Sequence, residues 1–207
     1  MSKKLKLAVL ISGRGSNLKS LIAACSEKDF PAEIVVVISN RPDAKGLEYA
    51  KDAGIKTEVV DHKKYKFRVR FEEAMQEKIK KSGAELVCLA GFMRLLTKWF
   101  VEQWEDRIIN IHPSLLPAFP GTNVQEKAIK AGVKFSGCTV HFVRPEMDSG
   151  PIIIQSAVPV YANDKVEDLE QRILKSEHIC YPLAVRMIAE GGVEIKDEVV
   201  HIKGQKK

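Results

Sequence analysis

The sequence contains four cysteines among 207 residues, and no two of them form a Cys-x-x-Cys pair. They are Cys25, Cys88, Cys138 and Cys180, and they stand in apolar stretches such as residues 86–89. The five histidines are equally scattered, so the ligand spacing that a zinc site requires is absent. We therefore expect reduced core thiols in a reducing compartment, with no disulfide framework and no metal.

Long hydrophobic runs are also missing. No segment approaches the ~20 apolar residues that a membrane-spanning helix needs. The N-terminus is basic and then apolar, but the apolar run at residues 7–11 is too short for a signal peptide and is interrupted by the polar residues 13–17. The sequence therefore predicts a cytoplasmic protein that does not interact with membranes.

Aromatic residues are few, at 7%, and they do not alternate with basic residues as they would on a nucleic-acid-binding surface. The net charge is +6, and the basic residues are dispersed apart from residues 63–70 and 203–207. This pattern is typical of a solvated surface, and we expect no nucleic-acid partner. A positive field also favours anionic substrates.

Short apolar runs alternate with amphipathic stretches along the whole chain, and no repeat or linker interrupts them. The pattern predicts a single α/β domain, residues 1–207, with a mostly parallel sheet of about seven strands and helices on both faces. Expected strands are residues 5–12, 33–40, 57–61, 86–92, 108–112, 139–143 and 152–160. Expected helices are residues 16–26, 44–53, 67–82, 97–104, 124–131 and 166–190, and residues 194–202 are expected to add an edge strand.

The first expected strand runs into Ser-Gly-Arg-Gly-Ser-Asn-Leu, residues 12–18. A dinucleotide-binding turn would have glycine in place of Leu18 and an acidic residue in place of Asn40, so a nicotinamide cofactor is disfavoured. Two interpretations remain. Gly15, Ser16 and Asn17 form a phosphate pocket at a helix N-terminus, or Ser16 is an ordinary helix cap.

Asn110 and His112 lie two residues apart in an expected strand, so their side chains point to the same face near its carboxyl end. Pro113 cannot extend the strand and helps to end it there. Ligands of parallel α/β sheets bind beyond the carboxyl ends of the strands. An amide donor and an imidazole at that place indicate a catalytic pair.

Asp148 stands in the segment Asp-Ser-Gly-Pro, residues 148–151. This composition suits a turn, which is one explanation of the aspartate. The other is that its carboxylate orients His112 and raises the pKa of that imidazole. Spacing in the sequence permits either interpretation.

Five motifs occur in one order: Ser-Gly-Arg-Gly-Ser-Asn-Leu at 12–18, Ala-Gly-Phe-Met-Arg-Leu at 90–95, Asn-Ile-His-Pro-Ser-Leu-Leu-Pro at 110–117, Asp-Ser-Gly-Pro at 148–151, and Glu177-His178 followed by Tyr181-Pro182. Together they resemble the phosphoribosylglycinamide formyltransferases, within the folate-dependent formyltransferase superfamily. The resemblance implies a Rossmann-like single domain whose N-terminal half binds the phosphate of the acceptor and whose C-terminal half binds folate.

The resemblance also implies a reaction. The formyl group of 10-formyltetrahydrofolate passes to the glycyl amine of 5-phosphoribosylglycinamide by direct attack through a tetrahedral intermediate, without a metal. Asn110, His112 and Asp148 would be catalytic. The acceptor would be held by Gly15, Ser16, Asn17 and Glu177. Folate would be held by Arg68, Met93, Arg94, Leu95, Leu96, Asn110 and the loop Arg144, Pro145, Glu146, Met147 and Asp148. We expect the partners to be these small-molecule substrates, and the protein to be a monomer or a homodimer.

One departure from the family concerns the helix that carries Glu177. Some relatives have a lysine near the phosphate where this chain has Leu174, and the adjacent Lys175 is the candidate replacement. Two alternatives remain open at this point. The acceptor could be another amine, such as a sugar nucleotide, or the chain could be a non-catalytic binding module, although the latter would be expected to have lost Asn110, His112 or Asp148.

Overall fold

The computed structural model describes residues 3–204. Its seven-stranded sheet has the order β3-β2-β1-β4-β5-β6-β7, which confirms the predicted α/β fold with about seven strands. The chain divides into two compact units, Met1–Asn110 and Ile111–Lys207. Strand β5, Ile108–His112, contributes residues to both.

The first unit contains four further strands, and every strand pairing within it is parallel. The strands are β1 (Leu5–Ile11), β2 (Ala32–Ser39), β3 (Thr57–Val59) and β4 (Leu86–Leu89). The helices are α1 (Ser16–Cys25), α2 (Gly46–Asp52), the short 3-10 helix η1 (His62–Lys64), α3 (Arg68–Ser82) and α4 (Lys98–Gln103).

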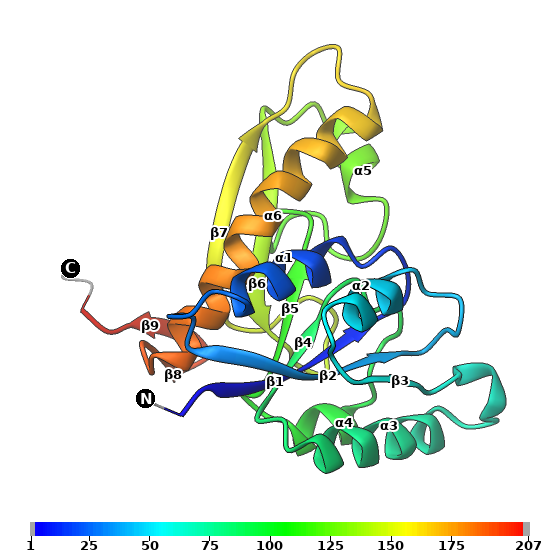
Figure 1. Cartoon of the computed structure of the whole chain (residues 1–207). Coiled ribbons are helices and arrows are strands. Elements are labelled where there is room, and N and C mark those ends of the chain that lie inside the picture. The colour runs from blue at the N-terminus through cyan, green and yellow to red at the C-terminus, as the bar shows by residue number, and fades with distance from the viewer. Residues whose placement is uncertain (1–2, 205–207) are drawn as a thin grey trace. The chain divides into compact units, whose positions relative to one another are not determined.

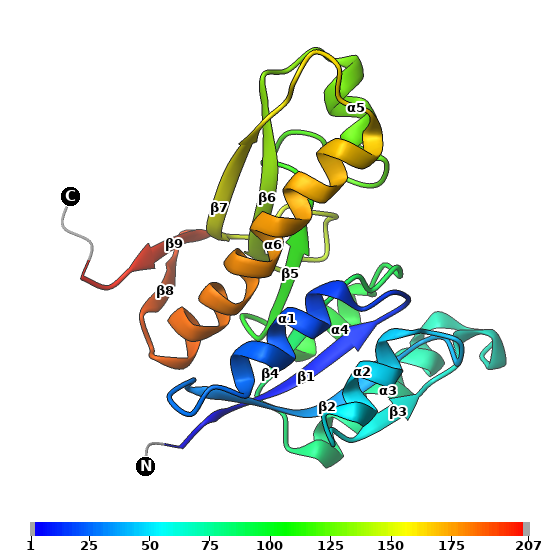
Figure 2. The same cartoon turned by 45° about the horizontal axis from the view of Figure 1, so that its top comes forward.

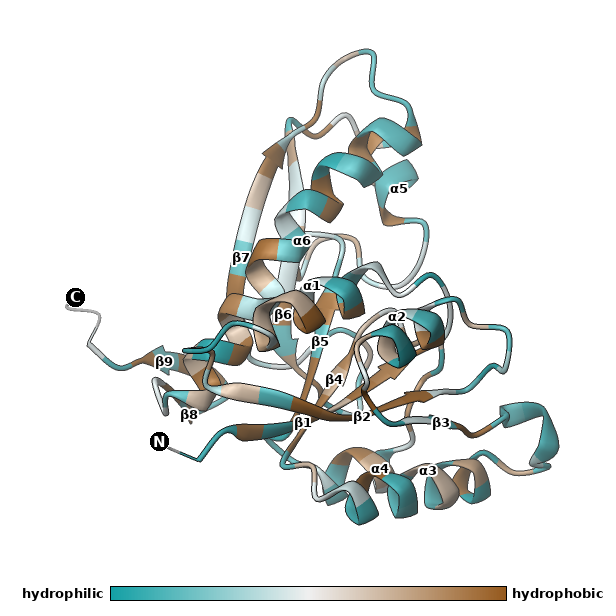
Figure 3. Ribbon diagram, in the orientation of Figure 1, coloured by the Kyte–Doolittle hydropathy of each residue, from teal (hydrophilic) through white to brown (hydrophobic). Residues whose placement is uncertain are grey.

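The core of this unit lies along its central strands. Leu7, Ala8, Val9, Leu10 and Ile11 of β1 are all completely buried. Helices α1 and α2 cover one face of these strands and α3 and α4 the other (Figure 1). Coloured by hydropathy, the central strands are brown and the outer sides of the helices are largely teal (Figure 3). A parallel strand covered on both faces is apolar along its whole length, which is why the apolar runs predicted these strands.

The order of the strands brings two loops to one edge of the sheet. Strand β4 returns to pair with β1, and Leu10 lies beside Leu89 near the carboxyl ends of both strands. The backbone N–H of Ala90 donates to the carbonyl of Leu10 at 2.9 Å. The loops that follow β1 and β4 therefore start side by side, at the type of switch point where α/β proteins bind ligands.

The second unit is built on an antiparallel pair of strands and one long helix. Strands β6 (Phe135–Phe142) and β7 (Ile152–Pro159) pair along most of their length. The 24-residue helix α6 (Val166–Ala189) packs along both of them and continues through Pro182 (Figure 2). The short helix α5 (Val124–Lys130) precedes β6, and the strands β8 (Val193–Lys196) and β9 (Val199–Ile202) follow α6.

Three predictions differ most from the structure, while several other element ends differ by one or two residues. The expected edge strand at residues 194–202 is wrong, because β8 and β9 form a separate two-stranded sheet around a turn in which Asp197 and Glu198 have positive φ. Strand β4 ends at Leu89, three residues early, and Gly91 with φ 73° lies in the loop that follows. Strand β6 begins at Phe135, four residues before the predicted start.

Candidate active site

The glycine-rich turn after β1 is packed against the start of α2. Gly15 is the N-cap of α1 with φ 74°, a conformation that favours glycine. A Cβ atom on Gly15 would lie 2.6 Å from Cα of Gly46, and Gly46 N–H donates to the carbonyl of Gly13 at 3.0 Å. Ser16 is the first residue inside the helix and Gly15 has no side-chain cap, so the interpretation of Ser16 as an ordinary cap is wrong.

The turn presents the N-terminus of a ten-residue helix beyond the carboxyl end of β1. Backbone N–H groups in a first helical turn, together with the helix dipole, favour an anion at such a place. Arg14 is exposed, Ser16 is half-buried and Asn17 is buried. The helix begins without an acidic residue in its first turn that would compete for this position.

A hydrogen-bonded network, which no motif in the sequence indicated, joins the ends of three strands. The hydroxyl of Ser12 donates to Oδ1 of Asn40 at 2.6 Å and accepts from the N–H of Met93 at 2.8 Å. Asn40 in turn contacts His62 through its side-chain nitrogen, which lies 3.1 Å from Nδ1 of the histidine. Asn40, noted in the sequence only because it is not acidic, therefore helps to hold the loop after β4 beside the loop after β1.

The predicted folate-binding segment, residues 93–96, is held at both ends. Ser12 anchors Met93, and Glu72 of α3 anchors Thr97, whose N–H donates to Oε1 of Glu72 at 2.8 Å. Between these anchors Met93 is 75% exposed and Leu95 58% exposed, although both are large apolar side chains. The segment therefore presents two large apolar side chains to solvent, which a flat heterocycle could cover.

Two arginines of the predicted folate site lie near this segment. Arg68 is the first residue of α3 and is exposed. The guanidinium of Arg94 lies over the ring of Phe71, 5.9 Å from its centroid. Burial raises the pKa of the Glu72 carboxyl, and the charges of Arg68 and Arg94 partly oppose that rise.

Strand β5 carries Asn110 and His112 on one face, because side chains alternate along a strand. Asn110 lies beside Leu89 at the end of β4, so it reaches the same sheet edge as the loops after β1 and β4. His112 is buried, with 5% of its surface exposed.

Both ring nitrogens of His112 have partners in the second unit. Nε2 lies 3.0 Å from the carbonyl oxygen of Phe119, and Nδ1 lies 3.5 Å from Oδ2 of Asp148. A carbonyl accepts only, so Nε2 carries the hydrogen of that contact. The structure thus brings His112 and Asp148 together, at ion-pair distance rather than at the distance of a short hydrogen bond.

The loop that carries Asp148 is positioned by its own backbone. Asp148 has φ 53°, and its Oδ2 accepts from the N–H of Gly121 at 2.8 Å. Gly150 lies so close to the backbone carbonyl of Phe142 that a Cβ atom would overlap it. Pro151 accepts from the N–H of Phe142 at 2.9 Å. The turn chemistry and the contact with His112, which the sequence offered as alternatives, therefore coexist.

Arg144 makes a contact that the sequence did not indicate. Its guanidinium forms two hydrogen bonds to the carboxylate of Glu198, at 2.7 and 3.1 Å, in the turn between β8 and β9. Arg144 holds the pKa of the Glu198 carboxyl below its usual range. The following residues Pro145, Glu146 and Met147 are exposed. A ligand would therefore meet these three residues of the loop, because the Arg144 guanidinium is bonded to Glu198.

Glu177 lies on the buried side of α6 with 6% of its surface exposed, whereas Lys175 is exposed. Two residues along a helix turn the side chain by roughly 200°, so Lys175 points away from the direction of Glu177. Lys175 is therefore badly placed to replace the lysine that some relatives carry where this chain has Leu174.

Two buried polar side chains on β6 support the His112 region. Thr139 accepts from the N–H of Leu116 at 3.0 Å and donates to the carbonyl of Ser114 at 2.7 Å, which fixes the chain just after β5. His141 is 2% exposed, and burial lowers its pKa, with Asp148 acting in the opposite direction and His112 in the same direction. Strand alternation could have found both, because they share a face of β6.

Residues 3–204 contain no group of three or more His, Cys, Asp or Glu side chains arranged to hold a metal ion. Within the same range, none of the helices is long and apolar enough to cross a membrane. The four cysteines are free thiols; Cys88, Cys138 and Cys180 are buried and Cys25 is half-buried.

Comparison with known proteins agrees with the fold. A family model described as formyl transferase matches residues 5–185. The chain is 40% identical over 200 residues to phosphoribosylglycinamide formyltransferase of Haemophilus influenzae, covering 97% of this chain and 94% of that protein. The Escherichia coli protein of the same description is 38% identical over 202 residues, with 98% and 95% covered.

A longer relative is the trifunctional purine biosynthetic protein adenosine-3 of Gallus gallus, 48% identical over 194 residues. The match covers 94% of this chain but only 19% of that protein, so the chain spans about a fifth of its length. Among solved structures, glycinamide ribonucleotide transformylase 1 of Symbiobacterium toebii is similar, with a TM-score of 0.95 and 48% identity. The match covers 98% of this chain and 95% of that one.

Proposed function

Because this chain belongs to the formyl transferase family, we propose that it transfers the formyl group of 10-formyltetrahydrofolate to the glycyl amine of 5-phosphoribosylglycinamide, a reaction of purine biosynthesis. The observation that carries the proposal is the contact between His112 and Asp148. His112 lies on β5, and Asn110 lies on the same face of that strand. The similar proteins of full matching length support this choice of acceptor.

Asn110 and His112 stabilise the negative charge that develops when the amine attacks the formyl carbon. The side-chain amide of Asn110 and the protonated imidazole of His112 are hydrogen-bond donors on one strand face. Donors that are already oriented towards a developing oxyanion stabilise the transition state without reorganising, and loss of one donor typically slows a reaction by ~100- to 1,000-fold.

His112 also moves protons, because the attacking amine must lose one and the departing folate nitrogen must gain one. Asp148 fixes the orientation of the ring, since its carboxylate lies 3.5 Å from Nδ1. Nε2 is engaged by the carbonyl of Phe119. Proton exchange with the substrate through Nε2 therefore requires this contact to open when the substrates bind.

The acceptor binds through its phosphate at the N-terminus of α1. Gly15 and Gly46 let two backbones pass closely, which leaves the first-turn amides of Ser16 and Asn17 beyond the end of β1. Glu177 binds the glycinamide side of the acceptor by resemblance to the family, and its carboxylate is suited to an ammonium or amide donor.

The folate binds against Met93, Arg94, Leu95 and Leu96, with Arg68 near its acidic end, and against the loop from Arg144 to Asp148. The residues present fit such a ligand. They offer exposed apolar side chains, held backbone groups and two guanidinium groups that match a carboxylate. We propose further that the enzyme works in the cytoplasm, as a monomer or a homodimer.

The proposal is tested by turnover of the purified protein. An absorbance assay with 10-formyltetrahydrofolate and 5-phosphoribosylglycinamide should show formation of tetrahydrofolate and formylated product. A parallel assay supplies amino sugar nucleotides as acceptors. Turnover with these acceptors but not with 5-phosphoribosylglycinamide would contradict the assigned acceptor, although formyl transfer would still be supported. No turnover with any acceptor would contradict the proposed formyltransferase activity.

A further inference from the structure

Glu72 is a completely buried carboxylate on the inner side of α3. Both of its oxygens are occupied by one residue. The N–H of Thr97 donates to Oε1 at 2.8 Å, and the hydroxyl of Thr97 donates to Oε2. Burying an ionised carboxylate is costly unless it is paired and hydrogen-bonded, so the position of Glu72 is not explained by packing alone.

Two positive charges lie near the same carboxylate. Burial raises the pKa of Glu72, whereas the hydrogen bonds from Thr97 and the charges of Arg68 and Arg94 lower it. Arg94 has its guanidinium over Phe71, the neighbour of Glu72, and its buried Nε has no hydrogen-bond partner among the described residues. Glu72 thus holds the end of a loop through both of its oxygens, and the charges of two arginines act on the same carboxylate.

That loop is the segment in which the proposed folate site begins. The Ser12 hydroxyl holds it at Met93 and Glu72 holds it at Thr97, so only three residues lie between the anchors. With both ends held, the segment can expose Met93 and Leu95 without collapsing onto the core. Binding to such a preorganised segment avoids the entropy loss of ordering it.

We propose that Glu72 is a positioning residue for the folate: through its two hydrogen bonds with Thr97 it sets the conformation of residues 93–96. This inference rests on the proposed function, because it assigns residues 93–96 to the folate. The carboxylate does not touch the ligand itself. Its effect is specific to one of the two substrates.

The test is Glu72→Gln. The side chain keeps its shape, but the charge near the two arginines is lost and one acceptor becomes a donor facing Thr97. Charge-assisted hydrogen bonds of this type are stronger than neutral ones. We expect the KM for 10-formyltetrahydrofolate to rise about tenfold, a loss that corresponds to one such bond. The KM for the acceptor and kcat should stay within about a factor of two, since no reacting atom is touched.

A direct binding measurement separates this inference from the identity of the acceptor. Isothermal titration calorimetry with 5-formyltetrahydrofolate, a stable folate, should give the same loss of affinity in the variant. If the wild-type protein binds no folate, that result contradicts both the proposed function and the proposed role of Glu72. If the wild type binds and Glu72→Gln binds equally well, only the role of Glu72 is overturned.

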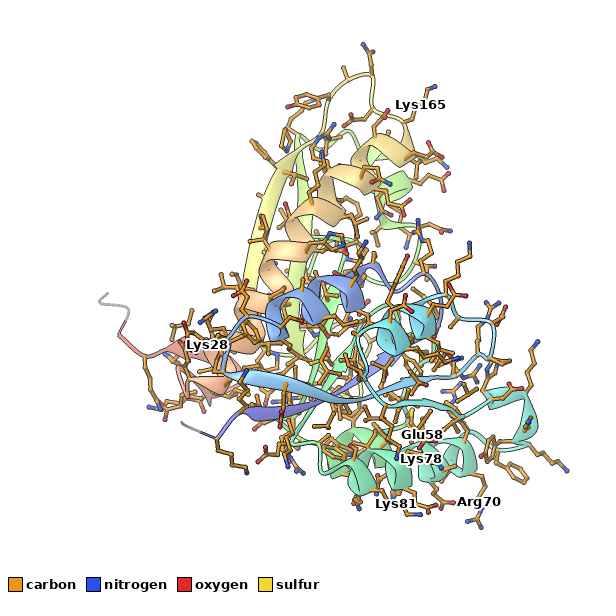
Figure 4. The ribbon with its side chains drawn as sticks, in the orientation of Figure 1. Lys28, Glu58, Arg70, Lys78, Lys81 and Lys165 are labelled. Atoms are coloured by element: carbon orange, nitrogen blue, oxygen red, sulfur yellow. The ribbon has the colours of Figure 1, made fainter. Side chains whose placement is uncertain are left out.

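Glu73→Gln is the matched control. Glu73 is the next residue of α3 and pairs with Arg70 at 2.8 Å on the exposed side of the helix. Arg70 and Lys81 point outwards from that side (Figure 4). The control should leave both KM values unchanged. Equal increases in the KM for both substrates in Glu72→Gln would indicate general loss of structure and would overturn the inference.

Two variants of Thr97 test the same contact if Glu72→Gln does not fold. Thr97→Val removes the hydroxyl that donates to Glu72, and Thr97→Ser keeps it. Both change the same side chain, which also caps α4 by accepting from Phe100 N–H. The serine variant should bind folate like the wild type and the valine variant several-fold more weakly. Equal folate affinity in both variants would contradict the proposal.

Discussion

The hydroxyl of Ser12 accepts a hydrogen bond from the backbone N–H of Met93 at 2.8 Å, across a separation of 81 residues. Ser12 directly follows β1 and Met93 lies in the loop after β4, and these two strands are neighbours in the sheet. One side chain therefore links the turn proposed to bind the phosphate to the segment proposed to bind the folate. Because the hydroxyl also donates to Asn40, the position of this link is set by the end of β2 as well.

The catalytic proposal predicts a loss in kcat when His112 is changed. His112→Ala should lower kcat by at least about 100-fold while both substrates still bind, because its contribution lies in the transition state. Single-turnover rates and substrate titrations of the same preparation measure the two effects separately. Near-normal turnover of His112→Ala would remove the mechanism.

Asp148 should act through His112 and not independently. Asp148→Ala removes the carboxylate 3.5 Å from Nδ1 and also the acceptor of Gly121 N–H, so it should slow turnover severely as well. The double variant His112→Ala with Asp148→Ala should lose much less than the product of the two single losses. Fully multiplicative losses, measured as kcat/KM, would show that the two residues act separately.

The phosphate site is best tested at Ser16. Gly15→Val is unsuitable, because any Cβ atom at Gly15 approaches Gly46 and φ is 74°. In Ser16→Asp the new carboxylate favours the helix N-terminus, so the melting temperature should stay the same or rise. The same charge repels a phosphate, so the KM for the acceptor should rise about tenfold or more.

The KM for 10-formyltetrahydrofolate is the internal control of the Ser16→Asp measurement and should change little. Ser16→Asn, which adds no charge, should leave acceptor binding nearly intact. An Asp variant that binds the acceptor normally would place the phosphate elsewhere.

Changing Met93 should affect folate binding but not the stability of the fold. Its side chain is 75% exposed, so Met93→Ala removes little buried surface and should change the free energy of unfolding by less than about 0.5 kcal/mol. A folate that covers this side chain would lose apolar contact, and its Kd should rise several-fold. Phe135→Ala, at a 63% exposed position at the start of β6, is the comparison and should leave the Kd unchanged.

His141 predicts a pH dependence of stability. Burial lowers the pKa of His141 below its ordinary value of 6.5 in the folded protein. Between the folded and unfolded pKa values the unfolded chain binds a proton that the folded chain does not, so the free energy of unfolding increases with pH there. The contribution is complete above pH 6.5 and is lost as the pH falls through the folded pKa.

Denaturant titrations from pH 7.5 to 5 measure this slope. His141→Gln has no titrating group at this position, so its stability should fall less steeply on acidification than that of the wild type. Near pH 7.5 the two curves should run parallel, because His141 is largely neutral in both the folded and the unfolded state there. Parallel curves throughout the range would show that His141 does not contribute.

Local patterns in the sequence determined the elements of the fold. The central strands β1 and β4 could be predicted because a strand buried on both faces is continuously apolar, as in Leu7–Ile11. Strand alternation also placed Asn110 and His112 on one face without any knowledge of the fold. The sequence failed where boundaries depend on pairing: it extended β4 beyond Leu89 and missed that the tail pairs with itself.

Tertiary structure alone decided which polar groups meet. Asp148 could have been only a turn former, and the contact with His112 depends on a loop that closes against Gly121 and Phe142. Glu72 and Thr97, 25 residues apart, have no periodic relation in the sequence. The periodicity of a helix or strand specifies which side of an element is buried. A hydrogen bond between residues of two different elements depends on where both elements lie. Those positions are set only when the sheet and the helices on it have packed together.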